Sequence, residues 1–181
     1  MKLLDRILQR WRIAVAGPWI PRGSRVLDVG CADGALIRAA GGRVRDAVGI
    51  DPDAPAGSGL IHGSFPQDLR DRGPYDVLAL LAVFEHVPDG ERPAFVAACR
   101  DLLRPGGRVV ITVPAPLVDR IVDTLRRLRL LHGMDIEAHH GYRPEETPTY
   151  FAAAGMRLVT HEPFEFGLNH LFVFELPVAS R

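Results

Sequence analysis

The sequence carries no net charge, has few cysteines and contains no long apolar run. Its 22 acidic residues balance 22 basic residues, so no overall field attracts a polyanion and nucleic acid is disfavoured as a partner. Cys31 and Cys99 are too few for a disulfide framework and lack the spacing of metal ligands. The longest apolar run, 77–84, is far shorter than the roughly 20 residues of a membrane-spanning helix. These absences favour a cytoplasmic protein with no integral membrane segment.

The N-terminal segment differs from a secretory signal, because charged and polar residues interrupt its apolar positions. Leu4, Leu8, Trp11 and Val15 recur at helical spacing, which predicts an amphipathic helix packed on a sheet. A chain of 181 residues without repeats or low-complexity segments is predicted to form one domain.

The chain is organised around residues 26–34, Val-Leu-Asp-Val-Gly-Cys-Ala-Asp-Gly. A short apolar run that ends in small residues is typical of a buried parallel strand entering a tight turn and then a helix. Gly30, Ala32 and Gly34 at alternate positions would let a ligand approach the backbone. The carboxylate of Asp28 would repel a phosphate but could hold an ammonium group. Taken alone, this stretch could also be an ordinary strand-to-helix turn.

Further apolar segments follow at the spacing of alternating strands and helices. Asp51 comes at the end of the second predicted strand, where ligands bind in open α/β sheets, and its carboxylate could accept both hydroxyls of a ribose. Residues 51–59 contain two prolines and two glycines, which predicts a loop instead of a crossover helix. The other predicted strands are 60–61, 75–81 and 109–113, followed by an antiparallel hairpin of 156–166 and 171–176.

Three motifs in this order resemble those of class I S-adenosylmethionine-dependent methyltransferases. The first is the loop 28–34, in which Ala32 replaces the family's central glycine. The second is Glu-His-Val-Pro-Asp at 85–89, and the third is Leu-Arg-Pro-Gly-Gly-Arg at 103–108. The nicotinamide-binding fingerprint G-x-G-x-x-G fits poorly, since Ala35 occupies its last position. The resemblance spans about 26–113 and points to members that act on small molecules.

The resemblance implies an α/β, single-domain, Rossmann-like methyltransferase fold. Its sheet would have seven mostly parallel strands in the order 3-2-1-4-5-7-6, with helices on both faces and a reduced helix between strands 2 and 3. Within one domain of 1–181, residues 1–20 would contain the N-terminal helix and 25–113 the cofactor-binding half. Residues 117–181 would then supply a substrate-side helix, a loop and the closing hairpin.

The resemblance also implies how S-adenosylmethionine would bind. Asp28 and the glycine loop would hold its methionine end, with Ala82 facing the same portion, and Asp51 with Pro52 would hold the ribose. The family often has an aspartate at the adenine, where this chain has Ser64 and then Phe65, which could equally be a core residue. The complete predicted cofactor set is Asp28, Gly30, Cys31, Ala32, Gly34, Asp51, Pro52, Ser64, Phe65 and Ala82.

Methyl transfer requires a nucleophile held in line with the methyl group, and a general base only where that nucleophile carries a proton. The candidates are His86 after the fourth strand, and His139, His140 and Tyr142 in a late loop; histidine is suited because its pKa lies near neutrality. The two adjacent histidines could equally be surface residues. They make a poor set of metal ligands, so no metal is expected.

We therefore expect methyl transfer from S-adenosylmethionine to a small-molecule acceptor by in-line displacement, in a cytoplasmic enzyme that could be a homodimer. The arginine-rich segment 117–131 would be either a solvated helix face or a surface for an anionic substrate or partner. One alternative is a module that binds the cofactor without turnover, as the shortened region after Asp51 suggests. The other is a nicotinamide-dependent oxidoreductase, which Asp28 opposes.

Overall fold

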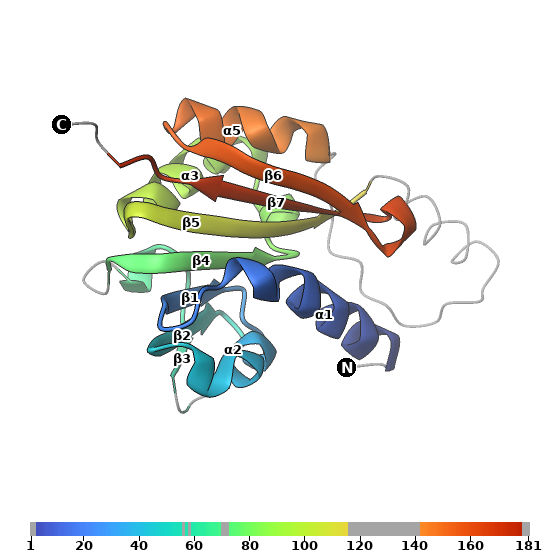
Figure 1. Ribbon diagram of the computed structural model, residues 1–181, viewed down its shortest axis with the longest axis vertical. Coiled ribbons are helices and arrows are strands. Elements are labelled where there is room, and N and C mark those ends of the chain that lie inside the picture. Colours follow the sequence, from blue (N-terminus) through green and yellow to red (C-terminus); the bar gives the residue numbers. More distant parts are fainter. Residues whose placement is uncertain (1–2, 56, 58, 70–72, 116–141, 179–181) are drawn as a thin grey trace.

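The computed structural model describes residues 3–55, 57, 59–69, 73–115 and 142–178. A seven-stranded sheet runs through its centre in the order β3-β2-β1-β4-β5-β7-β6 (Figure 1). The first five strands pair in parallel, while β7 is antiparallel to both of its neighbours. The predicted topology is confirmed. The strands are β1 (Arg25–Val29), β2 (Asp46–Asp51), β3 (Leu60–His62), β4 (Tyr75–Leu81), β5 (Leu103–Pro114), β6 (Arg157–Phe164) and β7 (Asn169–Glu175).

Helices cover both faces of this sheet, as expected for strands with apolar residues on each side (Figure 1). One face carries the N-terminal helix and the helix after β1, and the other carries the helices that precede β5 and β6. Within the residues described here, no helix is both long and apolar enough to cross a membrane. The helices are α1 (Leu3–Ala16), α2 (Ala35–Ala40), α3 (Arg92–Asp101) and α5 (Thr147–Ala153).

The central strand β4 shows why two cores form. Its side chains alternate between the faces, so Leu78 and Leu80 join the core under α3 and α5. Val77 and Ala79 join the second core, under α1 and α2. All four residues are fully buried, which explains the continuous apolar run in the sequence.

The fifth strand begins earlier than predicted. Leu103 already pairs with Tyr75, and the register then jumps to the pair Val77 and Arg108. Residues 104–107 thus lie opposite the single residue Asp76, so the Pro-Gly-Gly turn forms an irregularity inside β5. Proline and glycine in a strand are typical of such interruptions.

Other local predictions have clear outcomes. The described part of 51–59 contains no helix, as expected from its prolines and glycines. Pro148 occupies the first turn of α5, where its missing N–H has no intrahelical partner to lose. The predicted helix 117–131 lies outside the described residues, as do His139 and His140.

We predict that Phe151→Ala strongly destabilises the fold. Phe151 is fully buried, and its ring stacks on that of Phe174 with a centroid separation of 4.4 Å. Truncation should lower the free energy of unfolding by about 3–5 kcal/mol, measured by urea denaturation. Phe166→Ala is the matched control, because Phe166 is 98% exposed. Equal effects of the two substitutions would contradict this account of the core.

Candidate cofactor site

The candidate site lies where the strand order reverses, between β1 and β4. Sheets of this type bind ligands at such a switch point, beyond the carboxyl ends of the strands. A pocket of about 240 Å³ opens there, and its walls include Asp28 and Gly30 at the end of β1 and Leu81 and Ala82 at the end of β4. The structure therefore brings predicted residues of the loop 28–34 together with Ala82 from the segment after β4.

Gly30 is required by the geometry of the turn after β1. Its φ angle is +70°, and a Cβ atom built on it would lie 2.4 Å from Cγ2 of Val83. Any larger residue would therefore collide with the segment after β4. This close approach places the side chain of Val83 directly against the backbone of Gly30.

Asp51 connects the cofactor loop to the end of β2. Its Oδ2 accepts a hydrogen bond of 3.0 Å from the N–H of Ala32, and its Oδ1 accepts one of 2.7 Å from the N–H of Asp53. Each carboxylate oxygen has a second lone pair and can accept another donor, such as a ribose hydroxyl. Asp51 thus links β2 to the cofactor loop by a hydrogen bond and is also a candidate group for binding the ligand. Pro52, beside it, is exposed.

Asp28 is a buried carboxylate with an unusual pKa. Its side chain is 3% exposed, and within the described part of the chain it makes no hydrogen bond or ion pair. Burial raises its pKa from 3.8 to about 8, and the negative charges of Asp51 and Asp33 add to the effect. In the ligand-free protein near pH 7 this carboxyl group is therefore mostly protonated, and a cationic ligand group beside it would favour its ionised form.

The N-terminal helix supplies a counterpart that sequence reasoning missed. Arg12 and Gln9 of α1 line the same pocket as Asp28. The Nε atom of Arg12 is buried and has no hydrogen-bond partner among the described residues, whereas Gln9 donates to Oδ1 of Asp33 over 3.2 Å. A guanidinium and a carboxylate in one pocket match the two charges of a free amino acid group. The residues present therefore fit the methionine end of S-adenosylmethionine.

The predicted adenine end is more open. Ser64 is exposed, and its N–H donates to Oδ2 of Asp68 over 2.7 Å. Asp68 thus places a carboxylate beside the position where the family often has an aspartate. The sequence signal for this carboxylate was an aspartate four residues after Ser64. The ring of Phe65 is half-buried and packs on Phe95 with centroids 4.8 Å apart, so Phe65 is also part of the core.

The candidate bases lie in different environments. His86 is half-buried in the 3₁₀ turn Phe84–His86 that follows β4. Tyr142 is buried, its hydroxyl is hydrogen-bonded to Thr147, and burial raises its pKa. A phenol held in its protonated form is better suited to packing than to accepting a proton.

The thiols and potential metal ligands add little chemistry to the site. Cys31 and Cys99 are free and buried, and burial followed by the charge of Asp28 raises the pKa of Cys31 to about 12. That thiol therefore stays neutral near pH 7. In the described part of the chain, no three His, Cys, Asp or Glu side chains are grouped to hold a metal ion.

We predict that Asp28 makes the ligand-free protein less stable as the pH rises. Its pKa is higher in the folded state than in the unfolded state, so its stabilising contribution is complete below pH 3.8 and is lost as the pH rises through about 8. Asp28→Asn should remove a slope on the order of 1 kcal/mol per pH unit. Urea unfolding of both proteins at pH 5.5, 7 and 8.5 measures this difference. Parallel pH profiles would contradict it.

A second prediction concerns Ala32, which replaces the family's central glycine. Its φ angle of +45° is unfavourable for a residue with a Cβ atom. Ala32→Gly should therefore leave the free energy of unfolding unchanged or raise it by up to about 1 kcal/mol, after the larger unfolded-state entropy of glycine is included. The control Ala152→Gly, on an exposed position of α5, should lower it by about 0.5–1 kcal/mol. A similar loss at both positions would argue against strain at Ala32.

Comparison with known proteins agrees with this geometry. A family model described as a methyltransferase domain matches residues 2–161. The ubiquinone biosynthesis O-methyltransferase of Acinetobacter baumannii (strain AYE) is 33% identical over 156 residues. That match covers 75% of this chain but 65% of the relative, so this chain spans less than two thirds of the curated protein.

Solved structures share the fold at low sequence identity. The N-methyltransferase NodS from Bradyrhizobium japonicum WM9 aligns with a TM-score of 0.66 at 16% identity, covering 97% of this chain and 100% of NodS. Magnesium protoporphyrin IX methyltransferase from Synechocystis PCC 6803 aligns with a TM-score of 0.65 at 16% identity, covering 97% of this chain and 87% of that protein. With the family model matching most of the sequence, the chain belongs to the class I S-adenosylmethionine-dependent methyltransferases.

Proposed function

We propose that this protein transfers a methyl group from S-adenosylmethionine to a small-molecule acceptor. The observation that carries the proposal is the pocket between β1 and β4, where the Asp28 carboxyl group and the Arg12 guanidinium lie together. Family membership supplies the reaction class. Because the relative cited above is named an O-methyltransferase, a hydroxyl oxygen is the acceptor atom we favour.

The cofactor is proposed to bind along the carboxyl ends of β1, β2 and β3. Asp28 would take the ammonium group and Arg12 the carboxylate of the methionine end, while the backbone of Gly30–Gly34 approaches the ligand closely. Asp51, flanked by Pro52, would accept the ribose hydroxyls, with Ser64 and Phe65 near the adenine. When bound, S-adenosylmethionine supplies an electrophilic methyl group on a sulfonium.

The chain's main contribution to the reaction would be positioning. Ala82 has a φ angle of +59°, and its N–H donates to the carbonyl of Thr112 over 2.9 Å. This bond fixes the segment after β4 against β5 and supports a rigid apolar wall of Leu81 and Ala82 beside the methyl site. A hydroxyl acceptor must also lose a proton, and His86 is the base that we propose for it.

The proposed setting of the enzyme follows from its chemistry. Two free buried thiols and a balanced charge support a cytoplasmic protein that does not bind nucleic acid. A second subunit that completes the acceptor pocket is compatible with the compact chain, and we keep the homodimer as part of the proposal. His139 and His140 remain predicted contacts of the acceptor.

We predict that S-adenosylmethionine and S-adenosylhomocysteine stabilise the protein, whereas NADH does not. Ligand at 100 times its Kd adds about 2.7 kcal/mol, which should raise the Tm by roughly 5–10 °C. Differential scanning fluorimetry with the three ligands in parallel measures the shift. Asp51→Ala should reduce it strongly, while Asp53→Ala, which alters an exposed neighbour, is the matched control.

Two outcomes would overturn parts of the proposal. Stabilisation by NADH alone would contradict the methyltransferase assignment. Tight binding of S-adenosylmethionine without turnover, in a screen of hydroxyl, amine and carbon acceptors that reports S-adenosylhomocysteine formation, would instead favour a non-catalytic binding module.

A further inference from the structure

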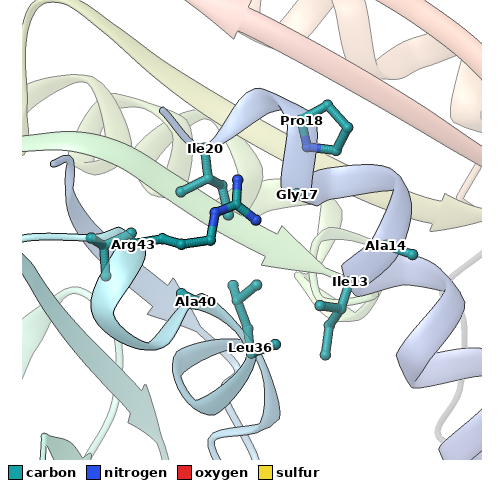
Figure 2. Close-up of a pocket in the computed structure, with 10 residues that line it drawn as sticks. Ile13, Ala14, Gly17, Pro18, Ile20, Leu36, Ala40 and Arg43 are labelled. Carbon is teal, nitrogen blue, oxygen red and sulfur yellow. The ribbon is translucent and has the colours of Figure 1, made fainter. Parts of the chain in front are cut away.

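The position of α1 matters because this helix supplies one wall of the candidate cofactor pocket. Gln9, Arg12 and Ile13 all line that pocket. On the α2 side, however, a second hollow of about 300 Å³ separates the two helices. Figure 2 shows Ile13 and Ala14 on one side of it, Leu36 and Ala40 on the other, and Arg43 reaching across. A hollow thus remains between α1 and α2 on this side, while Ile13 and Ala16 of α1 pack on the second core.

On its other side, α1 meets the turn between β6 and β7, the 3₁₀ segment Glu165–Gly167. The ring of Phe166 lies edge-on to that of Trp11, with centroids 6.3 Å apart. Glu165 and Phe166 have φ angles of +50° and +58°, which are costly for residues with a side chain. Such strain persists where surrounding contacts determine the conformation, and it often marks functional positions.

Complementary polar atoms lie on these two elements. Glu165 is 5% exposed; its Oε2 accepts a hydrogen bond from Asn169, and its Oε1 has no partner within the described part of the chain. The buried Nε of Arg12 also has no hydrogen-bond partner among the described residues. The charge of Arg12 lowers the pKa of Glu165, although burial raises it by more. The guanidinium therefore acts electrostatically on this carboxyl group.

We propose that Glu165, held by Asn169 on a strained turn, is a positioning residue that directs Arg12 into the cofactor pocket. The inference rests on the proposed function, in which Arg12 takes the cofactor's carboxylate. Arginine has five N–H donors, so one edge can face Glu165 while another faces the ligand. An arginine oriented before binding loses less side-chain entropy when the ligand arrives, which strengthens binding.

The test is a double-mutant cycle on S-adenosylhomocysteine affinity, measured by isothermal titration calorimetry. Arg12→Gln and Glu165→Gln should each weaken binding about tenfold, and the double variant should be no weaker than Arg12→Gln alone, because the carboxylate acts through the guanidinium. Glu175→Gln is the matched control: Glu175 lies on the same hairpin and pairs with Arg108 and Arg157. It should bind like the wild type.

A second variant separates positioning from folding. Glu165→Gly removes the carboxylate but adopts a positive φ without strain, so it should fold at least as stably as Glu165→Gln and still bind weakly. In a Trp19→Phe background, S-adenosylhomocysteine should change the fluorescence of Trp11 in the parent and change it less in Glu165→Gln.

Additive losses in the cycle would overturn the inference, as would wild-type affinity in both Glu165 variants. Neither result would contradict the proposed function, because the wild type would still bind S-adenosylhomocysteine. Failure of the wild type itself to bind S-adenosylhomocysteine would contradict the proposed function.

Discussion

The site is built around a carboxyl group, that of Asp28, which the fold buries and which has no ion-pair partner among the described residues. Asp28 belongs to β1, in the middle of the sheet, where its neighbours across the strands are Gly49 and Ala79. Nearby Asp51 and Asp33 oppose its ionisation further. A phosphate would face the negative charges of Asp51 and Asp33, whereas an ammonium group would favour the ionised form of Asp28. Electrostatics thus adds to Ala35, which stands at the last glycine position of the nicotinamide fingerprint, in separating this loop from dinucleotide-binding turns.

The geometry around Asp28 depends on a few contacts between elements that are distant in the sequence. Asp51 holds the N–H of Ala32, and Val83 leaves no room for a side chain at Gly30. These contacts join the ends of β1, β2 and β4. Such preorganisation is what an in-line displacement requires, since the reacting groups must already be placed when the acceptor arrives.

The strand order was implied by the family resemblance, and the strands and the glycine turn after β1 were largely predictable, because alternating buried strands and short glycine-rich turns leave local signals. The early start of β5 was not, since Pro105 and Gly106 normally end a strand and only the pairing with β4 shows that Leu103 already belongs to it. Asp68 and Arg12 were missed for a related reason. The roles of Asp68 and Arg12 depend on where their side chains lie in the folded protein. The sequence of a helix or loop shows which residues are polar but not which other elements they meet.

Arg12 shows this limit most clearly. Its position on an amphipathic helix predicts a solvated charge, yet its Nε is buried beside the pocket. Two tertiary features bring it there: α1 crosses the sheet near the carboxyl ends of its strands, and the strained turn at Glu165 and Phe166 meets the helix from the β7 side (Figure 1). Glycine would adopt those positive φ angles at no steric cost. The presence of a glutamate at the first of these positions indicates that its buried side chain, more than the turn itself, is what the position requires.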